Sequence, residues 1–308
     1  MEGKAPFAYV ANNRSHDVSV IDTATNTVVA TVPVDGAPIR IAVTPDGKRA
    51  YIAIRTQNTG TISVLDAANN TVVDTETVTD FFIAGVAITP DGKQAYVANS
   101  GNANAVSVLD TATNKVVANI PQRESIDLAF TPDGKHAYVT DFDGVSVIDT
   151  TGQKVQTTIP ISKADSSTVG RGIAITPDGK QAYLTNGGTN KVSVINTATN
   201  TVSTTVVVGV DPVGVAVTPD GKRAYVANHG SNDVSVIDTA TNAPMATVGV
   251  GPAPVAVATA ADGKHVYVTN SDSGTVSVID TATNTVAATV SVGGKPLAIG
   301  IIPPAPVT

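Results

Sequence analysis

The sequence has no cysteine, no tryptophan and no apolar run long enough to cross a bilayer as a helix. Without cysteine the chain cannot form disulfides, use a thiolate nucleophile or bind a metal through sulfur. Aromatic residues make up only 4% of the chain, whereas Val and Thr are abundant, and this balance favours strands over helices. The net charge of −7 has the wrong sign for a broad phosphate-binding surface, which needs clustered Lys and Arg.

What the sequence does contain is a repeat. The letters "YVTN" at Tyr267 to Asn270 return in near-copies such as "YVAN", "YLTN" and "YVTD" every 42 or 45 residues. The other copies begin at Tyr9, Tyr51, Tyr96, Tyr138, Tyr183 and Tyr225. Periods of this size indicate a propeller or a solenoid. All 7 tyrosines of the chain belong to the repeat, so we interpret them as packing residues and expect none to have a separate function.

One unit, read from Asp211, divides into four short β segments at residues 213–217, 223–227, 234–237 and 245–248. The first two segments are joined by "TPDGK", in which Pro presets φ and Gly takes the left-handed turn position. The last two are joined by the polar turn "IDTATN". Four antiparallel segments without a helical period are typical of a propeller blade.

The two ends of the chain complete one unit between them. The sequence opens on a second segment, Phe7 to Ala11, and closes on "KPLAIGIIPP", which has the pattern of a first segment. We therefore predict that residues 297–302 join residues 7–32 in one sheet. This predicts an all-β, seven-bladed propeller with four antiparallel strands per blade, in which residues 1–308 form a single domain. We also expect the closed ring to have no spare edge.

The motifs "TPDGK.AYV.N" and "VSVIDTATNTV" resemble those of the YVTN β-propeller repeat family over essentially the whole chain. The resemblance implies an exported protein, in the periplasm, on the cell surface or outside the cell, because relatives include archaeal surface-layer and bacterial envelope proteins. It also implies two alternatives, since one relative binds single-stranded DNA and more distant seven-bladed propellers are lyases or lactonases. No leader is recognisable at the start of this chain.

The two faces of the predicted ring differ in variability. The turns after the first and third segments are nearly the same in every unit, and their aspartates read as turn residues rather than metal ligands. The connections on the other face vary, and variable loops on a rigid frame usually carry function. Small residues should line the channel and make it inert; they are Ala42, Ala87, Ala129, Ala174, Ala216, Ala258 and Gly300.

Charged residues occupy one repeat position near the predicted mouth of the channel. Arg40 and Asp127 stand where the other units have Gly or Ala, and Arg171 lies one residue earlier in register. An Arg–Asp–Arg arrangement can hold a carboxylate or another polar ligand. The alternative is that these charges pair with each other and only fix the loops.

Three phenylalanines are not explained by the repeat, namely Phe81, Phe82 and Phe142. Together with Arg123 they fall in the irregular sector of residues 79–172. We predict a ligand-binding surface formed by this sector together with Arg40, comprising Arg40, Phe81, Phe82, Arg123, Asp127, Phe142 and Arg171. The alternative is that the Phe pair simply anchors an enlarged loop.

Metal and cofactor sites are not favoured by the sequence. Carboxylates near the mouth that might bind a hard cation are Asp127, Asp141, Asp143 and Asp211, but their spacing matches no known Ca²⁺ loop. We expect no cofactor and no catalytic residue, since no nucleophile or acid–base arrangement is recognisable.

The functional prediction is a non-catalytic binding or structural module at the cell envelope, whose variable face contacts a protein, a glycan or a small ligand. We expect a monomer without membrane insertion. The first alternative is a lyase or lactonase with a divalent metal at the mouth, for which Glu124 is the nearest candidate acid. The second is binding of single-stranded nucleic acid, which the negative charge and the lack of Trp disfavour.

Overall fold

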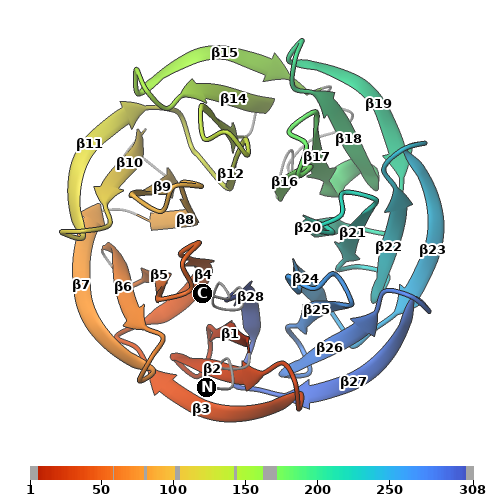
Figure 1. Cartoon of the computed structure of the whole chain (residues 1–308), viewed down its shortest axis with the longest axis horizontal. Helices are drawn as coiled ribbons and strands as arrows, with labels where there is room; N and C mark the ends of the chain where they lie inside the picture. The colour runs from red at the N-terminus through yellow and green to blue at the C-terminus, as the bar shows by residue number, and fades with distance from the viewer. Residues whose placement is uncertain are drawn as a thin grey trace.

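The computed structural model describes residues 6–57, 59–79, 82–100, 105–141, 144–161 and 172–302. Their strands form seven antiparallel sheets of four strands each, arranged as blades around one axis (Figure 1). The predicted seven-bladed β-propeller is therefore confirmed. Within the described ranges, no helix is long and apolar enough to span a membrane.

Each blade has an inner, a second, a third and an outer strand, counted from the axis outwards. Blade 1 is the sheet that contains β28 and β1, and the other blades follow in chain order. The inner strands are β28 (Pro296–Ile301), β4 (Ala37–Val43), β8 (Phe82–Ile88), β12 (Leu128–Phe130), β16 (Ile173–Ile175), β20 (Pro212–Val217) and β24 (Pro254–Thr259). The second strands are β1 (Phe7–Asn12), β5 (Arg49–Arg55), β9 (Gln94–Ser100), β13 (His136–Thr140), β17 (Gln181–Asn186), β21 (Arg223–Asn228) and β25 (His265–Asn270). The third strands are β2 (Asp17–Asp22), β6 (Gly60–Asp66), β10 (Ala105–Asp110), β14 (Gly144–Asp149), β18 (Lys191–Asn196), β22 (Asp233–Asp238) and β26 (Thr275–Asp280). The outer strands are β3 (Thr27–Pro33), β7 (Thr71–Thr79), β11 (Lys115–Pro121), β15 (Lys154–Pro160), β19 (Thr201–Val207), β23 (Ala243–Gly249) and β27 (Thr285–Ser291), and one short 3₁₀ helix, η1, covers Gly187–Thr189.

The second and third strands of each blade are buried on both faces because a neighbouring blade packs against each face. This explains why their sequences are nearly continuous in apolar residues rather than alternating. The core consists of seven clusters, each of which includes residues of two adjacent blades. In one of them, Tyr225 and Val236 of blade 6 pack with Val266 and Ile279 of blade 7.

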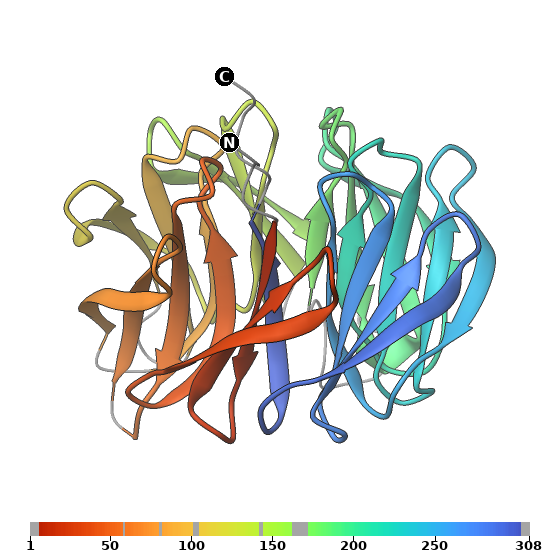
Figure 2. The same ribbon diagram turned by 60° about the horizontal axis from the view of Figure 1, so that its bottom comes forward.

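The ring closes as the sequence predicts. β28, the last strand, pairs with β1, the first, and the ladder places Tyr9 opposite Gly300. Figure 2 shows the blue C-terminal strand beside the red N-terminal strands of the same blade. The two ends of the chain therefore build blade 1 together.

The repeat tyrosines link each blade to the next. Their hydroxyl groups donate to asparagine side chains that occupy the left-handed position of the turn between the third and outer strands of the following blade. The pairs are Tyr9–Asn70, Tyr51–Asn114, Tyr138–Asn200, Tyr183–Asn242, Tyr225–Asn284 and Tyr267–Asn26. Between blades 3 and 4 the turn carries Gln153 instead, and the Tyr96 hydroxyl is buried without a partner among the described residues.

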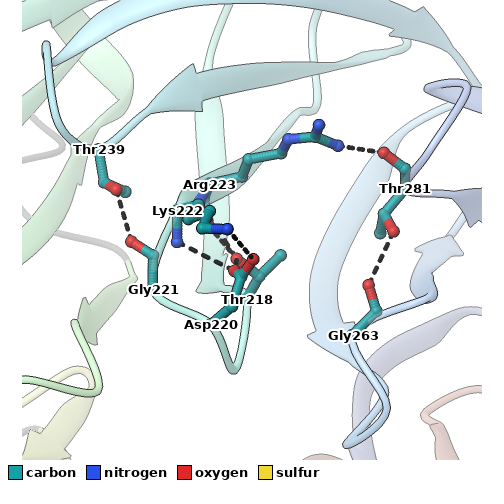
Figure 3. Close-up of polar contacts among 8 residues, drawn as sticks. All are labelled: Thr218, Asp220, Gly221, Lys222, Arg223, Thr239, Gly263 and Thr281. Carbon is teal, nitrogen blue, oxygen red and sulfur yellow. Dashed lines mark hydrogen bonds and ion pairs between the residues drawn. The ribbon is translucent and has the colours of Figure 1, made fainter.

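The turns after the inner and third strands lie on one side of the ring, which we call the repeat rim; the other connections form the variable rim (Figure 2). Figure 3 shows the repeat rim at blade 6. The Thr218 hydroxyl and the Lys222 N–H donate to the Asp220 carboxylate, at 2.6 and 3.0 Å. The Arg223 guanidinium donates to the carbonyl of Thr281 in blade 7. The aspartates of this rim therefore act as turn residues, as the sequence predicts.

Closure does not remove every sheet edge, and the prediction of a ring without a spare edge is wrong. The outer strand of each blade has a strand neighbour on one side only. Each outer strand instead carries a β-bulge at the same repeat position, because its ladder skips one residue. The skipped residues are Val29, Val73, Val117, Gln156, Ser203, Met245 and Ala287. A bulge bends the strand and makes its open edge a poor template for pairing with another chain.

Candidate binding site at the variable rim

One repeat position, within the inner strand of five blades and directly before it in blades 4 and 5, forms a ring around the axis, which we call the mouth ring. In blade 2, for example, the ladder places Arg40 opposite Ala53. A Cβ on Gly85 would lie 2.9 Å from the carbonyl oxygen of Ile126, so neighbouring inner strands approach too closely there for a side chain. The members are Arg40, Gly85, Asp127, Gly172, Gly214, Ala256 and Ala298. Charge on the mouth ring therefore comes from Arg40 and Asp127, as the sequence predicts.

The carboxyl group of Asp127 is half-buried between blades 4 and 5. It accepts a hydrogen bond from the Leu128 N–H at 2.9 Å, and the N–H of Ile173 in blade 5 also donates to it. Burial raises the pKa of this carboxyl above its usual range, although the positive charge of Arg40 and the two N–H groups act in the opposite direction. The negative charge of Asp127 is thus only partly compensated.

Arg40 lies two blades away from Asp127, across the side-chain-free position of Gly85. Its guanidinium donates to the carbonyl of Ile39 at 3.0 Å. No nitrogen–oxygen contact within 4.0 Å joins the Arg40 and Asp127 side chains, both of which lie in the described ranges. The structure therefore shows no direct pair between these two charges, and Arg171, the third charge of that alternative, lies outside the described residues. Both groups keep hydrogen-bonding capacity for a ligand.

Phe82, at the start of β8, is 44% exposed. The guanidinium of Arg55, from the end of β5 in blade 2, stacks over its ring with 4.7 Å between the guanidinium carbon and the ring centre. This is the geometry of a cation–π contact. Phe82 is therefore a surface aromatic held by an arginine rather than a buried loop anchor. Arg55 was not singled out from the sequence, although it directly follows the only repeat motif that ends in Ile.

Asp141 occupies the position of the motif asparagine in blade 4 and is buried inside the blade. Its carboxylate accepts from the Gln122 side chain and from the Gly144 N–H, both at 2.8 Å. A third donor is the Ser146 hydroxyl at 3.4 Å. The sequence pointed to Asp141 as a metal candidate and missed Gln122. In the structure its carboxylate oxygens are engaged by protein donors.

The remaining candidates are separated in the ring or lie outside the described residues. Asp211 begins blade 6, where its carboxylate lies 3.6 Å from the His229 imidazole, and Arg123 is exposed on the connection between β11 and β12. No group of three or more His, Asp or Glu side chains within the described ranges could hold a metal ion. The candidates outside those ranges are Phe81, Phe142, Asp143 and Arg171.

Comparisons with known families agree with the fold. A profile described as "Lactonase, 7-bladed beta-propeller" matches residues 127–296, more than half of the chain, and a profile of the cytochrome D1 heme domain matches residues 3–140. The chain therefore belongs to the seven-bladed β-propeller family described as lactonase. The matches support a propeller family and do not single out the YVTN repeat. No curated protein matches the chain.

Two solved structures are similar over nearly their whole length. Hydrazine synthase of Kuenenia stuttgartiensis has 26% sequence identity and a TM-score of 0.81, with 92% of this chain and 97% of that chain covered. A functionally unknown protein of Desulfotomaculum acetoxidans has 18% identity and a TM-score of 0.78, with 97% and 99% covered. The second likeness shows the fold alone.

The heme-domain match makes it necessary to ask whether the chain has ligands for a haem. Haem iron is usually held by His, Met, Cys or Tyr. None of these residue types occurs on the described inner strands. Of the two histidines in the matched range, His16 is exposed on the turn after β1 and His136 begins β13 at the repeat rim. The described residues thus do not fit a haem within the ring.

Proposed function

We propose that this member of the seven-bladed propeller family is a non-catalytic binding module whose variable rim contacts its ligand. The observation that carries the proposal is the mouth ring, where two opposite charges, Arg40 and Asp127, interrupt a circle of Gly and Ala. The two charged groups, from blades 2 and 4, would give a bound ligand an orientation. The likeness to YVTN-type surface proteins agrees with a binding role.

The chemistry of the two groups defines the ligand. A guanidinium binds a carboxylate or another planar anion through paired hydrogen bonds. The carboxyl of Asp127 favours an ammonium or a hydroxyl group, because its oxygens accept hydrogen bonds and the ionised form is negatively charged. The ligand best matched to this mouth therefore carries an anionic group and a hydrogen-bond donor. The exposed Phe82 and the Arg55 stacked on it add an aromatic contact on the neighbouring blades.

The test is a thermal-shift screen with amino acids, hydroxy acids and acidic oligosaccharides. A compound that binds the mouth should raise the Tm of the wild-type protein by mass action. This shift should disappear in Arg40→Gln and in Asp127→Asn, and it should persist in Lys222→Gln, whose exposed side chain belongs to the repeat rim. A shift that survives both mouth substitutions would contradict the proposed site.

The family match favours a second candidate function, the hydrolysis of a lactone. This is the alternative that the sequence raised, a lactonase with a divalent metal at the mouth and Glu124 as the nearest candidate acid. Calorimetry with Ca²⁺ and Mg²⁺, together with a lactone-opening assay in the presence and absence of EDTA, tests this candidate. Lactone opening that is lost in Asp127→Asn would replace the binding proposal with an enzymatic one.

A third candidate function is binding of single-stranded nucleic acid. The Phe82–Arg55 stack favours it, because bases stack on aromatic rings in basic grooves. The net charge of −7 works against it. A filter-binding assay with labelled oligonucleotides at low salt decides this question. For location we propose export, on the YVTN resemblance, and cell fractionation with an antibody against this chain tests it.

A further inference from the structure

Five buried side-chain amide oxygens lack a hydrogen-bond donor. They are the Oδ1 atoms of the asparagines that end the repeat motif, and they have no hydrogen-bond partner within the described ranges. The five residues are Asn12, Asn99, Asn186, Asn228 and Asn270. Each is at most 6% exposed. A buried acceptor without a partner is destabilising, and the same defect in five blades calls for a structural explanation.

The orientation of these amides is set by their neighbours. In all five blades the amide nitrogen donates to the hydroxyl of a serine on the third strand, for example from Asn228 to Ser235 at 2.9 Å. The Asn228 nitrogen also donates to the Asp233 carboxylate at 2.6 Å, and Asn12 does the same to Asp17. A flipped amide would turn its oxygen towards these carboxylates. Oδ1 is therefore directed away from the third strand.

The hydrogen-bond ladder between the second strand and the inner strand is interrupted beside the motif asparagine. In blade 6, Asn228 pairs with Pro212, but Val226 pairs with Val215, so the inner strand carries one extra residue between them. The same shift occurs next to the motif asparagine in blades 1, 3 and 7. A bulge leaves the extra residue outside the ladder and exposes its backbone polar groups. In these four blades the motif asparagine therefore stands beside the interruption of the ladder.

The two blades without a motif asparagine show what else can occupy this position. In blade 2 it holds Ile54, which has no polar side-chain atom to satisfy. In blade 4 it holds Asp141, whose carboxylate receives hydrogen bonds from Gln122 and Gly144. The unsatisfied oxygen therefore occurs where the residue is asparagine and no protein donor has been supplied.

We propose that each of the five motif asparagines binds one buried water molecule, which donates a hydrogen bond to Oδ1. In blades 1, 3, 6 and 7, whose ladders show the bulge, the water also accepts a hydrogen bond from a backbone N–H at the bulged start of the inner strand. Buried waters typically make about three such bonds to groups that would otherwise be unsatisfied. Since each asparagine directly follows the residue opposite the mouth ring, these waters tie the inner strands to the blades at the level of the mouth. This site is independent of the proposed ligand-binding function.

A crystal structure of the wild-type protein at about 1.5 Å resolution tests the proposal. We expect water density about 2.7–3.2 Å from Oδ1 of all five asparagines, and none at Ile54 or between Asp141 and Gln122. An asparagine whose Oδ1 is dry, or which accepts directly from a protein N–H, would overturn it.

A variant checks the same sites in solution. Asn228→Ile copies the residue that blade 2 already has, so it should fold and lose one water while keeping the other four. Water-oxygen magnetic relaxation dispersion counts long-lived internal waters, and the variant should show one fewer than the wild type. Equal counts would mean that Asn228 holds no water and would overturn the proposal independently of the crystal.

Discussion

The hydroxyl of Tyr267 donates a hydrogen bond to Oδ1 of Asn26 at 3.0 Å, although 241 residues separate them in the sequence. Tyr267 belongs to blade 7 and Asn26 to blade 1, so this bond closes the ring together with the ladder between β28 and β1. Burial raises the pKa of Tyr267 to about 12, and its hydroxyl therefore remains a donor throughout the physiological pH range.

Removing this hydroxyl should destabilise the ring. Tyr267→Phe leaves the Asn26 side chain without its donor, and we expect a loss of about 1 kcal/mol in the free energy of unfolding. The matched control is Tyr96→Phe, since the Tyr96 hydroxyl has no partner in the described part of the chain. Urea denaturation should show that this second change costs nothing or stabilises. Equal losses in the two variants would mean that the tyrosine–asparagine bonds do not stabilise the ring.

The missing bond between blades 3 and 4 can be supplied by one substitution. Gln153→Asn places the side chain that the other blades use at the same left-handed turn position, and Asn tolerates this conformation well. We expect a gain of about 1 kcal/mol in the free energy of unfolding, because the Tyr96 hydroxyl obtains an acceptor.

The second arm of this experiment repeats the substitution in a Tyr96→Phe background. The gain should vanish there, since the donor is absent, and the double-mutant cycle isolates the pairwise energy. An unchanged gain would assign the effect to the turn conformation of Asn alone.

Stability at the mouth should depend on pH through Asp127. Its pKa is raised by burial, so its contribution is fully present below the unfolded pKa, about 3.9, and is lost as the pH rises through the folded pKa. Asp127→Asn has no such dependence. The free energy of unfolding of the variant minus that of the wild type should therefore be larger at pH 7 than at pH 4. Denaturant unfolding of both proteins at the two pH values measures this difference. A difference that is flat, or that has the opposite sign, would show that folding does not raise the pKa of this carboxyl.

The repeat rim offers a matched pair of turn aspartates. Asp220 accepts from both the Thr218 hydroxyl and the Lys222 N–H, whereas blade 7 has Ala260 in place of the threonine and Asp262 accepts from the Lys264 N–H at 2.9 Å. Asp220→Ala should therefore cost about 1 kcal/mol more than Asp262→Ala in thermal or urea unfolding. Equal costs would mean that the threonine bond contributes nothing to the turn.

Several features of this protein follow from local sequence alone. The period of the tyrosines, the "TPDGK" and "IDTATN" turns and the division of blade 1 between the two ends are all visible without coordinates. The predicted boundaries of a unit, such as 223–227 for a second strand, differ from the observed β21 (Arg223–Asn228) by one residue. These features are predictable because a tight turn and the strands beside it are specified by neighbouring residues, and the repeat supplies seven copies of the same signal.

Other features were decided only by packing between blades. The sequence did not show that Tyr96 would lack a partner, that Arg55 would stack on Phe82, or that Gln122 would enclose Asp141. It also suggested an edge-free ring, whereas the open outer strands rely on bulges. The first three depend on which side chains of separate segments meet in the folded ring, whereas the bulges lie in the ladder within each blade. Such contacts join residues far apart in the chain, so no local pattern encodes them. The sequence thus determined the blades and their order, and the tertiary structure determined how the side chains between blades are satisfied.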